Sequence, residues 1–153
     1  MQQQTFNLFA DYNQFYLWDE DINPDTPTKW TDEDVARRLK VAPNIVVVCP
    51  IRNTTVPVTV EIHDAEPSSD VEKWDHIAEC SLDLPSGKLQ IHECTGGSVA
   101  RFTVPPGTYR VRVFYGALGQ LCDDGLEGKD HYSVVLWLAP PIELRVIKQY
   151  SEP

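Results

Sequence analysis

The stretch that decides the fold is Arg101-Phe-Thr-Val-Pro105-Pro-Gly107-Thr-Tyr-Arg-Val-Arg-Val-Phe-Tyr-Gly116. Apolar and polar residues alternate on both sides of Pro-Pro-Gly, as in strands that bury one face, and Pro with Gly is typical of a turn. The pattern therefore predicts a β-hairpin. Six residues are expected to face the core: Phe102, Val104, Tyr109, Val111, Val113 and Tyr115. Five are expected to face outward: Arg101, Thr103, Arg110, Arg112 and Phe114.

The same alternation recurs along the rest of the chain. Leu84-Pro85-Ser86-Gly87 repeats the design of the first turn and predicts a second hairpin. A continuous apolar run at 44–49 predicts a strand buried on both faces, whereas Pro57 predicts that strand 56–63 lies at a sheet edge. Further strands are expected at 5–10, 14–18, 74–84, 88–94, 133–138 and 142–147. About 8–10 strands predict one all-β domain, residues 1–153, folded as a mainly antiparallel β-sandwich.

One short helix is expected near residues 32–40. Thr31 is a good N-cap, Asp34 follows it by three residues, and acidic side chains suit the first turn of a helix. An apolar face is expected to pin the helix to the sheet through Trp30, Val35, Ala36 and Leu39.

Composition limits the classes of function. Thirteen basic and 23 acidic residues give a net charge of −10, a field that repels phosphate backbones and attracts basic proteins. Direct nucleic-acid binding is therefore not expected. No apolar run approaches the roughly 20 residues that span a bilayer, and residues 1–5 do not resemble a secretory signal. We expect a cytoplasmic protein without a membrane segment.

Acidic residues concentrate in two segments, 19–34 and 61–83, which hold fifteen of the 23. A focused negative surface speeds association with a basic partner, although two solvated acidic loops explain the same pattern. The predicted partner-binding residues form two patches. The first comprises Asp19, Glu20, Asp21, Asp32, Glu33 and Asp34. The second comprises Asp123, Asp124, Glu127 and Asp130 with His131.

The signals for catalysis or metal binding are weak. Alternation places His76 with Cys80, and His92 with Cys94, on single strand faces, but the spacing is not that of a zinc site, and whether the four meet is open. The four scattered cysteines favour buried thiols over disulfides. No nucleophile elbow, P-loop or dinucleotide motif occurs. We expect no metal, no cofactor and no catalytic residue.

The long polar loop at 118–131 supports an alternative function. Such loops are uncommon in compact domains and are often functional. With His131, Asp130 and Asp124 as polar groups, it could serve an enzyme or a small-ligand-binding protein. A third hypothesis is that the protein serves as a scaffold in a larger assembly.

Four short stretches, in order along the chain, resemble the competence protein J family of DNA-entry nuclease inhibitors. They are Tyr12-Asn13-Gln14-Phe15, Trp30-Thr31-Asp32-Glu33, Arg52-Asn53 and Pro105-Pro106-Gly107-Thr108-Tyr109. The resemblance covers residues 10–115 discontinuously; 64–97 and the chain after 116 have no counterpart. It implies a shared fold and, as function, an acidic antagonist that binds a nuclease. Most matched positions look structural, with Phe15 and Trp30 as core residues.

Charge and resemblance together predict a non-enzymatic protein that binds and inhibits a basic partner, a nuclease or a nuclease toxin. The sequence leaves the identity of the partner and a homodimer open.

Overall fold

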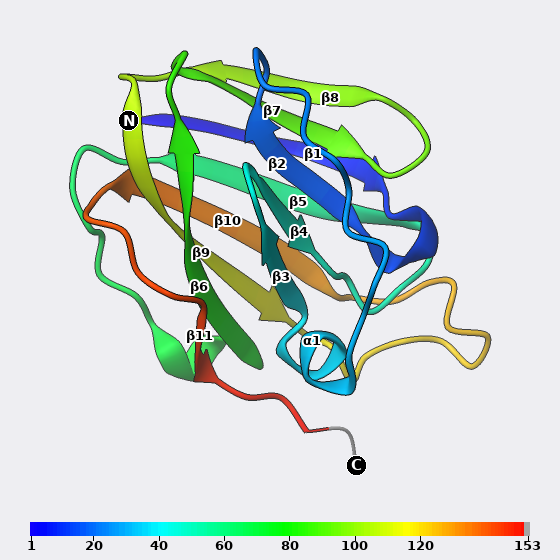
Figure 1. Ribbon diagram of the computed structural model, residues 1–153. Coiled ribbons are helices and arrows are strands. Elements are labelled where there is room, and N and C mark those ends of the chain that lie inside the picture. Colours follow the sequence, from blue (N-terminus) through cyan, green and yellow to red (C-terminus); the bar gives the residue numbers. More distant parts are fainter. Residues whose placement is uncertain (152–153) are drawn as a thin grey trace.

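Residues 1–151 of the computed structural model form two β-sheets packed face to face, with the main core between them (Figure 1). The larger sheet has six strands. In spatial order they are β1 (Gln2–Phe9), β5 (Thr55–Ile62), β10 (His131–Leu138), β9 (Gly107–Gly116), β6 (His76–Leu84) and β11 (Arg145–Lys148). All neighbours in this sheet are antiparallel except β5 and β10, which are parallel.

The smaller sheet has five antiparallel strands. In spatial order they are β3 (Leu39–Ala42), β4 (Ile45–Val48), β2 (Phe15–Asp19), β7 (Lys88–Glu93) and β8 (Ser98–Thr103). The helices are α1 (Asp32–Arg37) and two single 3₁₀ turns, η1 (Asp11–Asn13) and η2 (Val71–Lys73). The all-β fold class is confirmed, and residues 1–151 form eleven strands where about 8–10 were expected. None of the helices within residues 1–151 has the length and apolar character needed to cross a bilayer.

The two predicted hairpins are wrong, because β8 and β9 lie in different sheets, and so do β6 and β7. The chain from 76 to 116 is instead one long two-stranded ribbon that bends across the sandwich. Leu84 lies opposite Gly107 before the bend and Lys88 lies opposite Thr103 after it, so the register continues unchanged. Each Pro-x-Gly sequence is thus the point at which one strand of the ribbon bends from one sheet into the other.

The bend is held by close backbone contact. The N–H of Val104 donates to the carbonyl of Gly87 at 2.8 Å, and a Cβ on Gly87, whose φ is +72°, would lie 2.3 Å from the Val104 oxygen. The hydroxyl of Tyr109 donates to the carbonyl of Pro105 at 2.6 Å. Pro-Pro-Gly-Thr-Tyr is therefore a structural element of the fold.

Side chains of the two-stranded ribbon are buried on both faces of the larger sheet. The six predicted inward residues are buried between the sheets. Arg112 and Phe114, predicted to face outward, are also buried, because segment 64–75 covers the outer face of the sheet. Phe114 packs there with Trp74, at 5.3 Å between ring centroids, in a small second core with Ile77, Val135 and Trp137.

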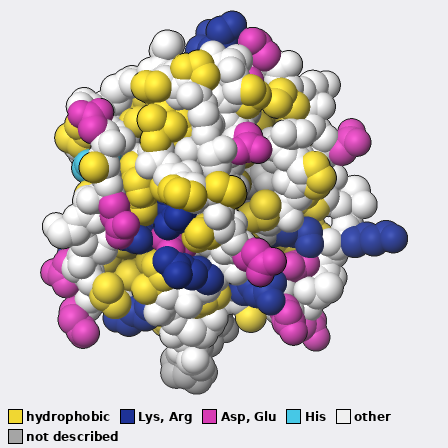
Figure 2. All heavy atoms as spheres, turned by 60° about the vertical axis from the view of Figure 1, so that its left-hand side comes forward, with side chains coloured by type: hydrophobic (Ala, Val, Ile, Leu, Met, Phe, Trp, Pro, Cys, Tyr) yellow, Lys and Arg dark blue, Asp and Glu magenta, His cyan; other side chains and the backbone are white. Residues whose placement is uncertain are grey.

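Arg112 lies in a charged cluster beside that second core. Its Nε donates to Glu79 at 2.9 Å, and its two terminal nitrogens reach Ser69 and Glu66. Arg145 on β11 donates to Glu79 as well. Figure 2 shows basic and acidic side chains side by side on one face of the molecule, so the net negative charge is not a uniform field there.

Helix α1 begins as predicted. Thr31 and Asp34 form a reciprocal capping box, with hydrogen bonds of 3.0 and 3.1 Å. The helix ends earlier, at Arg37, because Arg38 takes a left-handed conformation and Leu39 starts β3. Leu39 is buried, but Val35 and Ala36 are exposed, so the predicted apolar face does not pin the helix.

Strand β5 lies inside its sheet, so Pro57 does not mark an edge. The N–H of His63 donates to β10, which shows that odd-numbered residues of β5 turn their backbone groups toward β10. Pairing with β10 begins only at Val58. An N–H at position 57 would point toward β10 before the two strands begin to pair. The absence of this N–H in Pro57 therefore removes no hydrogen bond from the sheet.

Candidate functional site

One end of the sandwich brings together four segments: η1, helix α1, the connection 49–54 and the loop 117–130. Hydrogen bonds between side chains and backbone fix η1 against the connection. Asn13 donates through Nδ2 to the carbonyls of Pro50 and Ile51, and the N–H of Tyr12 donates to Asn53 Oδ1 at 2.8 Å. This network holds a tight turn at the surface.

Tyr12 is presented to solvent by this turn. Tyr12 and Asn13 both have φ near +57°, a left-handed conformation that costs an ordinary residue about 1–2 kcal/mol. The Tyr12 side chain is nevertheless 67% exposed and buries little apolar area in return. A strained, rigid and exposed aromatic residue is a feature that folding alone does not require.

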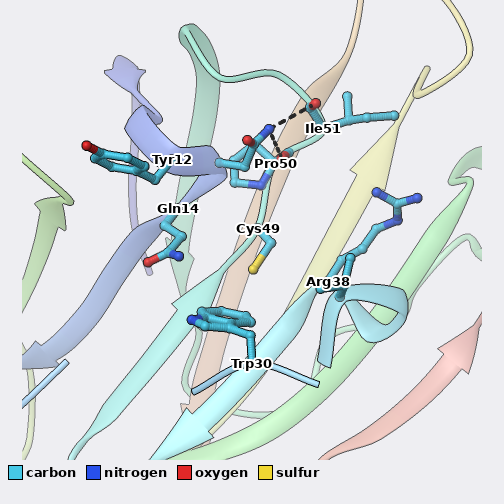
Figure 3. A pocket seen from close by; sticks show the side chains of 9 residues that line it. Tyr12, Gln14, Trp30, Arg38, Cys49, Pro50 and Ile51 are labelled. Carbon is cyan, nitrogen blue, oxygen red and sulfur yellow. Dashed lines mark hydrogen bonds between the residues drawn. The ribbon is translucent and has the colours of Figure 1, made fainter. Parts of the chain in front are cut away.

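A pocket of about 400 Å³ opens beside Tyr12 (Figure 3). In Figure 3 the thiol of Cys49 points toward the indole of Trp30, while Tyr12 and Arg38 lie on opposite sides. Val35 of α1 also lines the pocket and is 62% exposed. The full lining is Tyr12, Asn13, Gln14, Trp30, Val35, Arg38, Cys49, Pro50 and Ile51.

The pocket contains an uncharged thiol, Cys49, and its Trp30 side chain is positioned by Lys40. Burial raises the pKa of the Cys49 thiol to about 12, so it is a neutral, apolar group at pH 7. Lys40 lies 5.3 Å from the centre of the Trp30 ring and 2.6 Å from Asp34. The Lys40 contact is the leading cause that lowers the pKa of Asp34. Together these contacts fix Trp30.

Carboxylates lie on α1 next to the pocket. Asp32 is exposed and precedes Val35 by three residues, so both lie on the same helix face. Among residues 1–151 no hydrogen bond or ion pair engages the Asp32 carboxylate. Glu33 is also exposed and pairs with Arg37 at 2.8 Å. Asp32 is thus an unneutralised charge on the face of α1 that carries the pocket residue Val35.

Three predicted partner-binding residues are buried and hold the chain's own loops. Asp19 accepts from the N–H and hydroxyl of Ser86 at the bend; burial alone would raise its pKa, but these hydrogen bonds lower it overall. Asp34 belongs to the capping box and to the contact with Lys40. Asp130 accepts from Arg52 and from Tyr132, each at 2.6 Å. None of the three offers a free carboxylate to a partner.

The first predicted patch is split between two ends of the sandwich. Asp19 ends β2 and contacts Ser86 at the bend. Its neighbours, the half-buried Glu20 and the exposed Asp21, pair with Arg101 and Lys88. Helix α1 lies at the other end, where β2 begins: Phe15 pairs with Val48, and the N–H of Cys49 donates to Arg38. Asp32 and Glu33 are therefore a strand's length away from Asp21.

The loop 117–130 presents the second predicted patch only in part. Asp123, Asp124 and Glu127 are exposed, with Asp124 accepting from the Cys122 thiol and the N–H of Leu126 in a turn. Cys122 is exposed, against the expectation of buried thiols.

The polar groups of the enzyme alternative do not converge. His131 packs against Trp74 in a tilted arrangement, at 5.1 Å between ring centroids, and lines an open hollow of about 510 Å³. Neither Asp124 nor Asp130 lines that hollow, and each bonds a different set of partners.

The four potential metal ligands also lie apart. His76 bonds the Arg37 carbonyl, Cys80 is in the core, His92 packs on Trp18, and Cys94 accepts from Tyr16. Residues 1–151 contain no group of three His, Cys, Asp or Glu side chains that could hold a metal ion.

Sequence reasoning missed most of the pocket. The sequence predicts a break between strands at Tyr12 and Asn13, a core-facing position for Val35 and the end of a strand at Cys49. One signal did point there: three of the four stretches that carry the family resemblance, 12–15, 30–33 and 52–53, meet around this pocket.

No family model and no curated protein matches the chain. Two solved structures do. "ComJ, inhibitor of the DNA degrading activity of NucA", from Bacillus subtilis, superposes with a TM-score of 0.72 at 18% identity, over 89% of this chain and 96% of that one. "Crocagin biosynthetic gene J" superposes with a TM-score of 0.58 at 19% identity, over 92% and 100%. The resemblance predicted from four short stretches is thus confirmed at the level of architecture: the chain has a ComJ-like fold.

Proposed function

We propose that this protein is a non-enzymatic inhibitor that binds a basic DNA-degrading nuclease with the α1 end of the sandwich. One observation carries the proposal: an exposed Tyr12, presented by a hydrogen-bonded turn, borders a pocket of about 400 Å³ that is also lined by Val35, and the unpaired Asp32 lies on the same face of α1 as Val35. Aromatic anchors beside desolvated pockets supply most of the energy of protein interfaces.

The charge distribution supports a basic partner. Asp32, Glu33, Asp123, Asp124 and Glu127 are exposed at this end, on α1 and on the loop that the Arg52–Asp130 pair ties to the pocket. Such carboxylates increase the association rate with a basic surface and give it register. They can occupy the positions where the partner otherwise binds DNA phosphates. The ComJ-like fold supports the same role, because ComJ inhibits a nuclease.

An inhibition assay tests this function. The purified protein is mixed with NucA and with the DNA-degrading nucleases encoded in its own genome, and plasmid degradation is followed as its concentration rises. We expect stoichiometric, saturable inhibition of at least one nuclease, weakening as salt rises because exposed charges steer the encounter.

Two single-residue variants locate the interface. Tyr12→Ala is expected to weaken binding at least about tenfold, as hot-spot truncations do. Asp21→Asn removes one charge at the opposite end and is expected to leave binding nearly unchanged. If no nuclease is inhibited and no complex forms at low salt, the proposed function is wrong. If both variants weaken binding equally, the interface is elsewhere.

A further inference from the structure

Four strands form the open edges of the two sheets, and they differ in how they resist pairing with another chain. Strands β11 and β3 have only four residues each and carry Arg145, Lys148 and Lys40. Strand β8 carries Arg101, and its pairing with β7 is interrupted by a bulge. Short length, charge and bulges are the usual devices that keep sheet edges from associating.

Strand β1 has none of these devices. Its eight residues, Gln-Gln-Gln-Thr-Phe-Asn-Leu-Phe, include no charge and no proline, and its register with β5 runs from Gln2 to Phe9 without a bulge. It is the outer strand of the larger sheet (Figure 1). An edge of this length without protection is a template for another strand.

The backbone direction along β1 is defined by two hydrogen bonds. The N–H of Ala10 donates to Thr54 beside β5, whereas the N–H of Phe9 turns the other way and donates to Glu93. Because bonding direction alternates along an antiparallel strand, the even-numbered residues of β1 bond β5. Gln3, Thr5 and Asn7 therefore direct N–H and C=O groups to the open edge.

We propose that β1 pairs antiparallel with β1 of a second copy, about a twofold axis at Thr5, so that the two larger sheets become continuous. In this register Gln3 of each copy lies opposite Asn7 of the other, and each such pair exchanges two hydrogen bonds. The exposed Met1 falls opposite the exposed Phe9, which supplies an apolar contact at each end of the ladder.

The observations favour a second copy over an unrelated strand. The edge is self-complementary, because its three outward residues, Gln3, Thr5 and Asn7, are symmetric about Thr5. The N–H of Phe9 already donates to Glu93, so the hydrogen-bonded ladder ends before Phe9 in both copies. Two chains that each carry a charge of −10 can meet along it because its strand residues are uncharged and the carboxylate of Glu93 lies only at its end. The ladder uses β1 and not α1, so the dimer is tested separately from the proposed inhibition.

Sedimentation velocity from micromolar to submillimolar concentration tests the dimer. We expect the wild-type protein to reach twice its 17.3 kDa mass. Thr5→Lys places two like charges on the axis and is expected to be monomeric at every concentration, with an unchanged circular dichroism spectrum. Val41→Lys puts the same charge on β3, an edge strand of the other sheet, and should dimerise like the wild type.

Proline substitutions test the backbone direction. Thr5→Pro removes an outward N–H and the exposed hydrogen bond between the Thr5 and Thr59 hydroxyls, so it should abolish the dimer with little change in melting temperature, whereas Gln4→Pro breaks the β1–β5 ladder and should lower the melting temperature clearly. A wild-type protein that stays monomeric throughout overturns the proposal. So does a dimer that survives both Thr5→Lys and Thr5→Pro, or a Thr5→Pro variant that is as destabilised as Gln4→Pro.

Discussion

Arg52 and Asp130 form a buried ion pair across 78 residues of sequence, with Arg52 Nε 2.6 Å from Asp130 Oδ1. Arg52 also donates to the Leu126 carbonyl, and Tyr132 donates to the other carboxylate oxygen and accepts from the N–H of Ile51. The pair thus fixes the loop 117–130 to the connection beneath the pocket.

Breaking this pair is expected to be costly. Asp130→Asn should lower the free energy of unfolding by about 3–5 kcal/mol, because it leaves a buried guanidinium uncompensated. Urea unfolding measures the change. Glu33→Gln, in the exposed pair with Arg37, is the matched control and should cost less than about 1 kcal/mol. Equal effects of the two substitutions would contradict the structural role of the buried pair.

Tyr12 is expected to strengthen nuclease binding without stabilising the fold. Tyr12→Gly relieves the left-handed strain, so we expect the free energy of unfolding to stay unchanged or to rise by up to about 1 kcal/mol. Nuclease inhibition should nevertheless weaken at least about tenfold. A Tyr12→Gly variant that is both destabilised and fully inhibitory would show that the side chain serves folding.

The bend of the ribbon gives a prediction with a matched glycine control. Gly87 and Gly125 both have left-handed φ, +72° and +71°, but only at Gly87 does a Cβ meet backbone, 2.3 Å from the Val104 oxygen. Gly125→Ala should cost about 1 kcal/mol of unfolding free energy, the conformational penalty alone. Gly87→Ala should cost clearly more, because the backbone must also shift. Similar costs at both sites would argue against close contact at the bend.

His76 makes stability depend on pH. Burial lowers the pKa of His76, which lies between the carbonyl of Arg37 and the N–H of Tyr150. The unfolded chain then binds the proton more readily, so this contribution to stability is present above about pH 6.5 and is lost as the pH falls. We expect the unfolding free energy to fall from pH 7.5 to 5.5, by up to about 1.4 kcal/mol per pH unit. In His76→Gln that slope should shrink, and an unchanged slope would assign it to other groups.

Local patterning predicted the strands of the ribbon but not their partners. The alternation from 101 to 116 and the turn chemistry of Pro-x-Gly are the same whether a chain reverses direction or bends from one sheet to another. What separates the two cases is the contact of Gly87 with Val104, which lies far away in sequence. The outward assignment of Arg112 and Phe114 failed for a related reason: residues 64–70 have the composition of a polar loop, and Trp74, which packs on Phe114, is predicted as the start of a strand, so neither pattern indicates that this segment covers the sheet.

For the candidate site, the sequence predicted mainly that the segment around α1 is acidic. Net charge marks segment 19–34 as acidic, but it cannot distinguish Asp19 and Asp34, whose carboxylates satisfy backbone and side-chain donors, from Asp32, which is free to meet a partner. Helical periodicity misassigned Val35, because a six-residue helix that ends at Arg37 is too short to settle on one face. The left-handed turn that presents Tyr12 depends on Asn53, and no local signal reveals that bond.

Two exposed valines allow the most direct test of the binding face. Val35 borders the pocket on α1, and Val41 lies on β3, outside it. The binding constants of Val35→Arg and Val41→Arg for the inhibited nuclease are compared by titration calorimetry. If the α1 end binds a basic partner, Val35→Arg places a like charge in the interface and should weaken binding more than about tenfold, whereas Val41→Arg should bind like the wild type. Wild-type affinity in both variants would contradict binding at this end.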